Sequence, residues 1–198
     1  TFEDTAKTEA NRQLAASKVG DIYVFDSTVI ERQNKQIEQI FKVWEDLLLL
    51  PEEERLEAAK PYIDQFQLKP ETAQTILSLD SITLQAIKSE ALAILTEEWR
   101  KGIREGEVET ARKNILDEVY LRFNQADYVA FIQSVYRFLD LEPNYIFDKA
   151  ATKEAKEEAA QKEPPVLVTI YRNQKIIGKG EVVTKDHIAI LEALGYQR

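Results

Sequence analysis

The sequence predicts an α+β fold in which a predominantly helical bundle is inserted into a small β-sheet formed by the N- and C-terminal segments. Apolar residues recur every three or four positions through the middle of the chain, and β-branched and aromatic runs flank that region. The two flanks also resemble each other. We therefore expect a terminal α/β subdomain, residues 1–27 and 141–198, and a helical insert, residues 28–140.

Composition excludes several classes of protein. The chain has 198 residues, a net charge of −9 and no cysteine. The negative charge argues against binding to nucleic acid or anionic lipid, and the lack of cysteine removes disulfides and zinc-thiolate sites. The longest aliphatic run, Leu47–Leu50, is far shorter than the ~20 residues of a membrane span. With no methionine and no targeting segment, we expect a soluble domain excised from a longer protein.

The helical insert is predicted from caps and apolar stripes. Thr28 and Glu31 have the spacing of a capping box, while Pro51, Pro70 and Asp80 are suited to starting further helices. The stripes recur at helical spacing and are expected to face a common core. Their main positions are Ile37, Ile40, Phe41, Trp44, Ile87, Ile94, Trp99, Ile115, Val119, Ile132 and Val135.

The flanks carry strand patterns. One strand is predicted at residues 22–25 and a longer one at residues 166–171, with a polar turn and residues 175–177 completing a hairpin. Thr184 is expected to cap a final amphipathic helix that ends at Gly195.

An internal repeat relates the two flanks. Aligning Asp4 with Asp148 also aligns Thr8 with Thr152, and each pair is followed by an alanine-bearing helix and a β-branched strand. We infer that the strands at 22–25 and 166–171 are equivalent, and we place both in one sheet. The aspartates and threonines are interpreted as turns and helix caps in preference to ligand-binding groups.

Catalytic patterns are not found in the sequence. His187 is the only histidine, and the dipeptide that it forms with Asp186 is interpreted as a solvated pair in the first turn of a helix. Gly178 and Gly180 lack the spacing of a phosphate-binding loop and are interpreted as a bend. We expect no catalytic residues, no cofactor and no metal site in this chain.

Motifs at both ends resemble one known family. They are Asn144-Tyr145-Ile146-Phe147-Asp148, Val166-Leu167-Val168 and Gly180-Glu181-Val182-Val183-Thr184, together with the N-terminal Ile22-Tyr23-Val24-Phe25-Asp26. They resemble the extracytoplasmic domain of the bacterial seven-transmembrane HD-domain phosphohydrolases, the PgpH-type membrane proteins. The resemblance implies a domain outside the cell membrane whose parent degrades cyclic di-AMP with a cytoplasmic HD hydrolase. The catalytic residues of that family belong to a domain that this sequence does not contain.

The resemblance implies an extracytoplasmic sensory or ligand-binding domain that regulates cyclic-dinucleotide hydrolysis and is not itself an enzyme. Expected partners are a small ligand or an extracytoplasmic protein, transmembrane helices of the parent at both ends, and a second copy of the chain, with no nucleic acid. Because ligand sites favour concave junctions, we expect the site where sheet meets bundle. The candidate residues are Tyr23, Asp26, Tyr145, Asp148 and Tyr171.

Two alternatives remain at this point. The first is a passive scaffold that dimerises its parent without a small-molecule ligand. An exposed apolar patch or a two-fold interface would be evidence for it. The second is a stand-alone hydrolase. A pair of buried carboxyl groups that face each other in a cleft would be evidence for it.

Overall fold

The computed structural model describes residues 1–196, which form two compact units. The helical unit is Tyr23–Phe147, and the terminal unit combines Thr1–Ile22 with the chain from Asp148 onward. Most described residues are helical, and the strands form two small antiparallel sheets. The predicted α+β, mostly helical fold class is confirmed.

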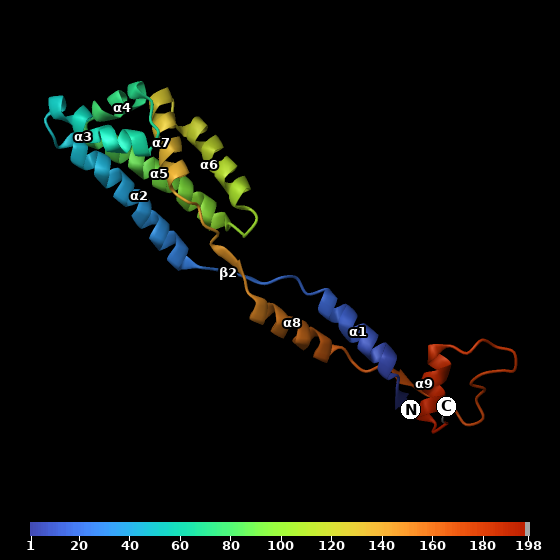
Figure 1. Ribbon diagram of the computed structural model, residues 1–198. Coiled ribbons are helices and arrows are strands. Elements are labelled where there is room, and N and C mark those ends of the chain that lie inside the picture. Colours follow the sequence, from blue (N-terminus) through green and yellow to red (C-terminus); the bar gives the residue numbers. More distant parts are fainter. Residues whose placement is uncertain (197–198) are drawn as a thin grey trace. The chain divides into compact units, whose positions relative to one another are not determined.

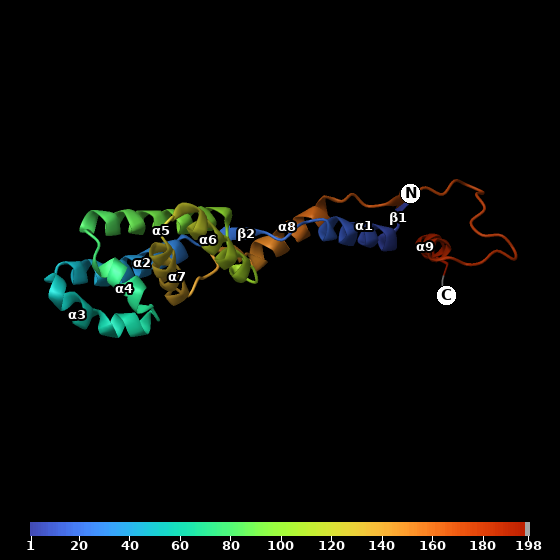
Figure 2. The same ribbon diagram turned by 90° about the horizontal axis from the view of Figure 1, so that it is seen from above.

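In the terminal unit, helix α1 (Thr5–Ser17) lies along helix α8 (Lys149–Lys162), as Figures 1 and 2 both show. Strands β1 (Phe2–Glu3) and β4 (Leu167–Val168) pair antiparallel, so the N- and C-terminal segments do meet as a sheet. The unit also contains α9 (Lys185–Ala193). Thr184 caps α9, as the sequence predicts.

Hydrogen bonds hold α1 against α8, where apolar burial is small. The N–H of Asp4 donates to the carbonyl of Val166, and the N–H of Val166 donates to Oγ1 of Thr8. In the same pattern, the N–H of Asp148 donates to the carbonyl of Ile22. The start of each helix is thus tied to the chain that follows the other helix, so the two helices run antiparallel.

The helical unit begins and ends with a second sheet. Strand β2 (Tyr23–Phe25) pairs antiparallel with strand β3 (Tyr145–Phe147), with Val24 opposite Ile146. The equivalence of the predicted strands is confirmed, because β2 and β4 each follow one copy of the repeat. Their placement in one sheet is wrong: each pairs instead with the short strand that opens the other copy.

The predicted hairpin at residues 166–177 is also wrong. Its turn does form, since the N–H of Gln174 donates to the carbonyl of Tyr171 at 3.0 Å, but residues 175–177 adopt no strand. The physical reason is that the sheet stops short of the turn, because β4 ends at Val168, opposite β1, a strand of two residues. Such a strand is too short to show an alternating pattern in the sequence.

Six helices build the rest of the helical unit. They are α2 (Ser27–Leu48), α3 (Glu52–Gln65), α4 (Pro70–Leu77), α5 (Ser81–Lys101), α6 (Val108–Arg122) and α7 (Ala126–Phe138). Pro70 and Asp80 occupy the predicted helix starts, and α3 begins after Pro51. The predicted capping box at Thr28 is wrong, because the carboxylate of Asp26, two residues earlier, caps α2.

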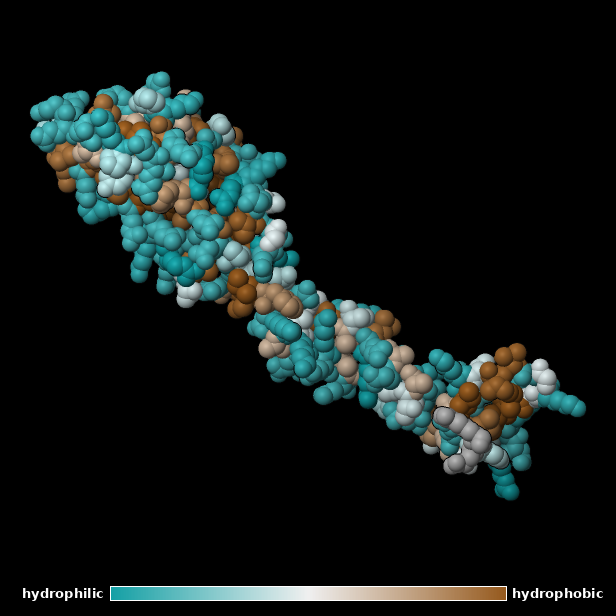
Figure 3. Space-filling model, viewed as in Figure 1, coloured by the Kyte–Doolittle hydropathy of each residue, from teal (hydrophilic) through white to brown (hydrophobic). Residues whose placement is uncertain are grey.

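The hydrophobic core lies entirely within this helical unit, and the predicted stripes converge on it. Trp44 and Phe41 of α2 meet Phe131 of α7 edge to face, with ring centroids 5.4 and 5.8 Å apart. Trp44 and Trp99 are both fully buried, as predicted. Figure 3 shows the mainly hydrophilic surface that encloses this core. Large aromatic side chains contribute most of the buried area in such a core.

Candidate functional site

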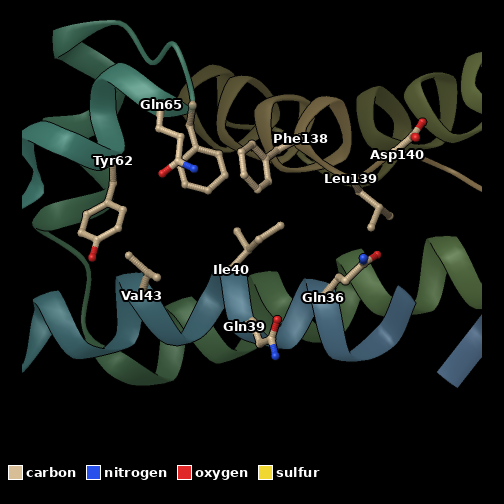
Figure 4. A pocket seen from close by; sticks show the side chains of 10 residues that line it. Gln36, Gln39, Ile40, Val43, Tyr62, Gln65, Phe138, Leu139 and Asp140 are labelled. Atoms are coloured by element: carbon tan, nitrogen blue, oxygen red, sulfur yellow. The ribbon is translucent and has the colours of Figure 1, made fainter. Parts of the chain in front are cut away.

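A groove opens on the helical unit between α2, the end of α3 and the end of α7 (Figure 4). Its cavity volume is about 400 Å³. Pockets of this size that are mainly apolar with a few polar groups are typical of ligand sites. The lining residues are Gln36, Gln39, Ile40, Val43, Tyr62, Gln65, Phe66, Phe138, Leu139 and Asp140.

The groove has an apolar interior. In Figure 4 the side chains of Ile40 and Phe138 point into the space between α2 and α7. Phe138 packs on Phe66 with ring centroids 4.7 Å apart, and Phe66 in turn contacts the buried Trp44. Phe138 nevertheless stays 47% exposed, because it is the last residue of α7 and the chain leaves the helix at Leu139.

Polar side chains surround this interior. Gln36 and Gln39 come from the exposed face of α2, and Gln65 comes from the last turn of α3. A primary amide carries both hydrogen-bond donors and acceptors, so it can bind neutral polar groups of either kind. The groove therefore combines apolar burial with directional hydrogen bonding.

One wall of the groove is the extended segment after α7, which α2 holds in place. The buried Gln33 donates from Nε2 to the carbonyl of Asp140 at 2.6 Å and accepts the N–H of Glu142 at 3.2 Å. Arg32 forms an ion pair with Glu142, with Nη2 3.0 Å from Oε1. These contacts fix the backbone of the wall, because each of them joins it to a side chain of α2.

Two of the predicted site residues come together on the small sheet of the helical unit. The rings of Tyr23 and Tyr145 lie 5.2 Å apart, and the guanidinium of Arg104 lies 4.2 Å from the centre of the Tyr23 ring. Phe25 stacks on Tyr145 at 4.4 Å. This aromatic cluster packs a cation against a tyrosine face, a favourable arrangement.

Asp26, which follows β2, is a helix cap. Its carboxylate accepts hydrogen bonds from the hydroxyl and the backbone N–H of Thr28. These bonds favour the ionised form and hold the pKa of Asp26 below its ordinary value. The carboxylate therefore caps the start of α2.

Asp148 and Tyr171 belong to the terminal unit. The carboxylate of Asp148 caps α8 by accepting the N–H of Ala151 at 2.9 Å. Asp4 caps α1 in the same way, which confirms the structural interpretation preferred for both aspartates. Tyr171 is 72% exposed, and its N–H donates to the side chain of Gln174.

The groove residues Phe66, Phe138 and the glutamines of α2 were not predicted. An aromatic residue at the end of an apolar stripe has the same pattern whether it lies in the core or at a groove, so the sequence offers no way to separate the two. The one usable signal is the pair Gln36 and Gln39, which places amides beside the stripe residue Ile40.

Residues 1–196 contain no group of three or more His, Asp or Glu side chains placed to hold a metal ion. His187 takes part in a capping box, because Nδ1 accepts the N–H of Thr184 at 3.1 Å. In the same described part of the chain, no helix has the length and apolar character needed to cross a membrane.

The structure thus defines a mostly helical α+β domain whose two terminal segments pair and whose inserted bundle carries a groove. The model of the 7TM-HD extracellular family, 7TMR-HDED, matches residues 1–198. The chain therefore belongs to this family and is an extracellular domain of a membrane HD-domain protein. Searches of curated proteins and of solved structures found no match.

Proposed function

We propose that this domain is a non-catalytic sensor that binds a ligand in the groove between α2, α3 and α7. Binding regulates the HD phosphohydrolase of its parent, a PgpH-type protein that hydrolyses cyclic di-AMP on the cytoplasmic side. The observation that carries the proposal is the groove itself: about 400 Å³, apolar inside and edged by three glutamine amides.

The connections between the two units support a role in transmitting a signal. The chain passes from one unit to the other twice, after Ile22 and after Phe147. On the terminal side, the N–H of Ile22 donates to Oγ1 of Thr152, and the N–H of Asp148 donates to the carbonyl of Ile22. The two connecting segments are therefore hydrogen-bonded to each other. A ligand that binds more tightly to one conformation of these segments increases the population of that conformation.

A thermal-shift screen of the domain against small metabolites, cell-wall fragments and nucleotides tests the binding step. A ligand at a hundred times its Kd stabilises the folded state by about 2.7 kcal/mol and raises the melting temperature. The shift should disappear in Phe138→Ala and persist in the control Leu121→Ala, which truncates an exposed leucine of α6. A shift in melting temperature that persists in Phe138→Ala would show that the ligand binds outside the groove.

Regulation is tested in the full-length parent protein reconstituted in vesicles. The ligand found in the screen should change the rate of cyclic di-AMP hydrolysis, and Phe138→Ala should abolish that change while leaving the rate without ligand as it was. An unchanged rate at saturating ligand would refute the regulatory part of the proposal.

One observation favours the alternative of a dimerising scaffold. Leu49 and Ile82 are 82% and 80% exposed, and Leu49 lines the same surface cavity as Ser81, the neighbour of Ile82. Exposed apolar residues that lie together are typical of protein contacts. Sedimentation tests this alternative: a dimer that Leu49→Glu dissociates, together with a screen that finds no ligand, would favour the scaffold.

A further inference from the structure

A second cavity continues the groove along α2. It has a volume of about 370 Å³ and shares two lining residues with the first, Gln36 and Gln39. Beyond them it is lined by Thr28, Arg32 and Lys35 and by the neighbouring Glu31. Positions 28, 32, 36, 39 and 43 follow helical spacing and so form one stripe on α2. The two cavities are therefore one track along a single helix face.

The length of this track argues against a small metabolite as the whole ligand. Thr28 and Val43 lie near the two ends of the track. With a rise of 1.5 Å per residue, they are separated by about 22 Å along the helix. An extended peptide advances roughly 3.3 Å per residue, so about six or seven residues span this distance.

The chemistry along the track changes from apolar to polar. Around Phe138 the cavity is large enough for more than one apolar side chain. In the middle, the amides of Gln36 and Gln39 offer donors and acceptors together, which matches the N–H and carbonyl of a peptide group. An anionic ligand such as a phosphate would gain little from charge there, because Lys35 of the same cavity is accompanied by the carboxylate of Glu31.

The end of the track near Thr28 carries both positive and negative side chains, so it does not favour a ligand of either charge. Arg32 is paired with Glu142, so its charge is compensated. Glu31 and Lys35 are exposed, and within residues 1–196 neither forms an ion pair. A polar, uncharged ligand segment is compatible with such an end, because its transfer from water costs less free energy than that of a charged group.

We propose that the ligand of the groove is an extended peptide of about six residues, with apolar side chains at the Phe138 end and polar residues toward Lys35. This inference rests on the proposed function, since it names the ligand class of the same groove. The peptide backbone bonds to Gln36 and Gln39, and the apolar side chains lie against Ile40 and Phe138.

Three synthetic probes test the inference by NMR titration of the ¹⁵N-labelled domain. The first is a hexapeptide of leucine, phenylalanine and four serines, acetylated and amidated at its ends, and the second is the same peptide in reverse order. The third is the dipeptide acetyl-leucyl-phenylalanine amide. One hexapeptide should bind about tenfold more tightly than the dipeptide and shift the side-chain amide signals of Gln36 and Gln39, because two peptide hydrogen bonds that contribute about threefold each multiply to about tenfold.

Matched variants show which residues hold the peptide. Replacing Gln36 and Gln39 together by alanine should weaken the hexapeptide about tenfold and leave the dipeptide nearly unchanged. The control is Gln161→Ala, which removes an exposed glutamine of α8 and should change neither.

Two outcomes overturn the inference and leave the proposed function standing. In one, dipeptide and hexapeptide bind equally well; in the other, no peptide binds while another compound of the thermal-shift screen stabilises the wild type and not Phe138→Ala. If no compound of either kind binds the groove, the inference and the proposed function fail together.

Discussion

Oγ1 of Thr152 accepts the backbone N–H of Ile22 at 2.9 Å, across 130 positions of the sequence. The same hydroxyl donates to the carbonyl of Asp148, so it ties the start of α8 to the segment after α1. Thr8 repeats both contacts at the other end of the helix pair, with Val166 and Asp4 as partners. Because α1 and α8 bury few apolar side chains, these two hydroxyls are a main source of the specificity of their pairing.

Replacing Thr152 by valine should therefore lower the free energy of unfolding by about 1–2 kcal/mol, since the N–H of Ile22 loses its partner at nearly constant side-chain volume. Thr8→Val should have a similar effect, and Thr152→Ser should retain most of the stability. Urea denaturation measures all three. Thr110→Val on the exposed surface of α6 is the control, and an equal loss there would contradict the role of the buried hydroxyls.

Gly102 ends α5 with a positive φ of 87°, and a Cβ at this position would lie 3.0 Å from the ring of Tyr145. Gly106 has nearly the same φ, 88°, but open space around it. Gly102→Ala should thus cost about 1 kcal/mol more than Gly106→Ala, because both strain the backbone and only one crowds a ring. Thermal unfolding of the two variants gives the difference, and equal costs would exclude the contact with Tyr145.

Asp127 accepts hydrogen bonds from the hydroxyls of Thr75 and Thr72 at 2.6 and 3.1 Å. The bond from Thr75 is the main cause that lowers the pKa of Asp127 below 3.8. A carboxyl whose pKa is lower in the folded than in the unfolded chain contributes stability above the unfolded pKa and loses it as the pH falls through the folded pKa.

Two measurements check this relation. Asp127→Asn should remove part of the fall in stability that accompanies acidification below about pH 4. Thr75→Val should raise the pKa of Asp127 toward its ordinary value, as an NMR titration of the carboxyl would show. A titration midpoint that does not move would assign the pKa shift to a different neighbour.

Arg104 and Tyr23 should be energetically coupled through the contact of the guanidinium with the ring face. A double-mutant cycle of Arg104→Ala and Tyr23→Leu should give a coupling of about 0.5–1 kcal/mol in chemical denaturation. A coupling near zero would show that the two side chains are neighbours without a stabilising interaction.

The helices of the insert could be predicted from the sequence, because each displays its buried stripe over several turns. Ile37 and Trp44 of α2, for example, are both fully buried. The pairing of the strands could not be predicted in the same way. Phe2–Glu3 is too short to have a period, and which strand it pairs with depends on residues far along the chain.

The candidate site was less predictable than the fold. Tyr23 and Tyr145 do lie together, but on two strands that pair with each other, whereas the sequence predicted no strand at Tyr145 and paired the strand of Tyr23 with residues 166–171. The groove depends instead on how three helices pack together near Phe66 and Phe138. No local sequence pattern predicts that packing. Phe138 has the same spacing as a core residue, and only its position at the end of α7 leaves it exposed.

The exchange of strand partners between the two copies of the repeat also constrains how the protein is made. During synthesis, Phe2 leaves the ribosome long before Val168, its partner in the sheet. The N-terminal copy must therefore wait, without its native partner, until the whole insert has been translated. The inserted bundle, whose core needs no residue from the terminal unit, is free to fold first.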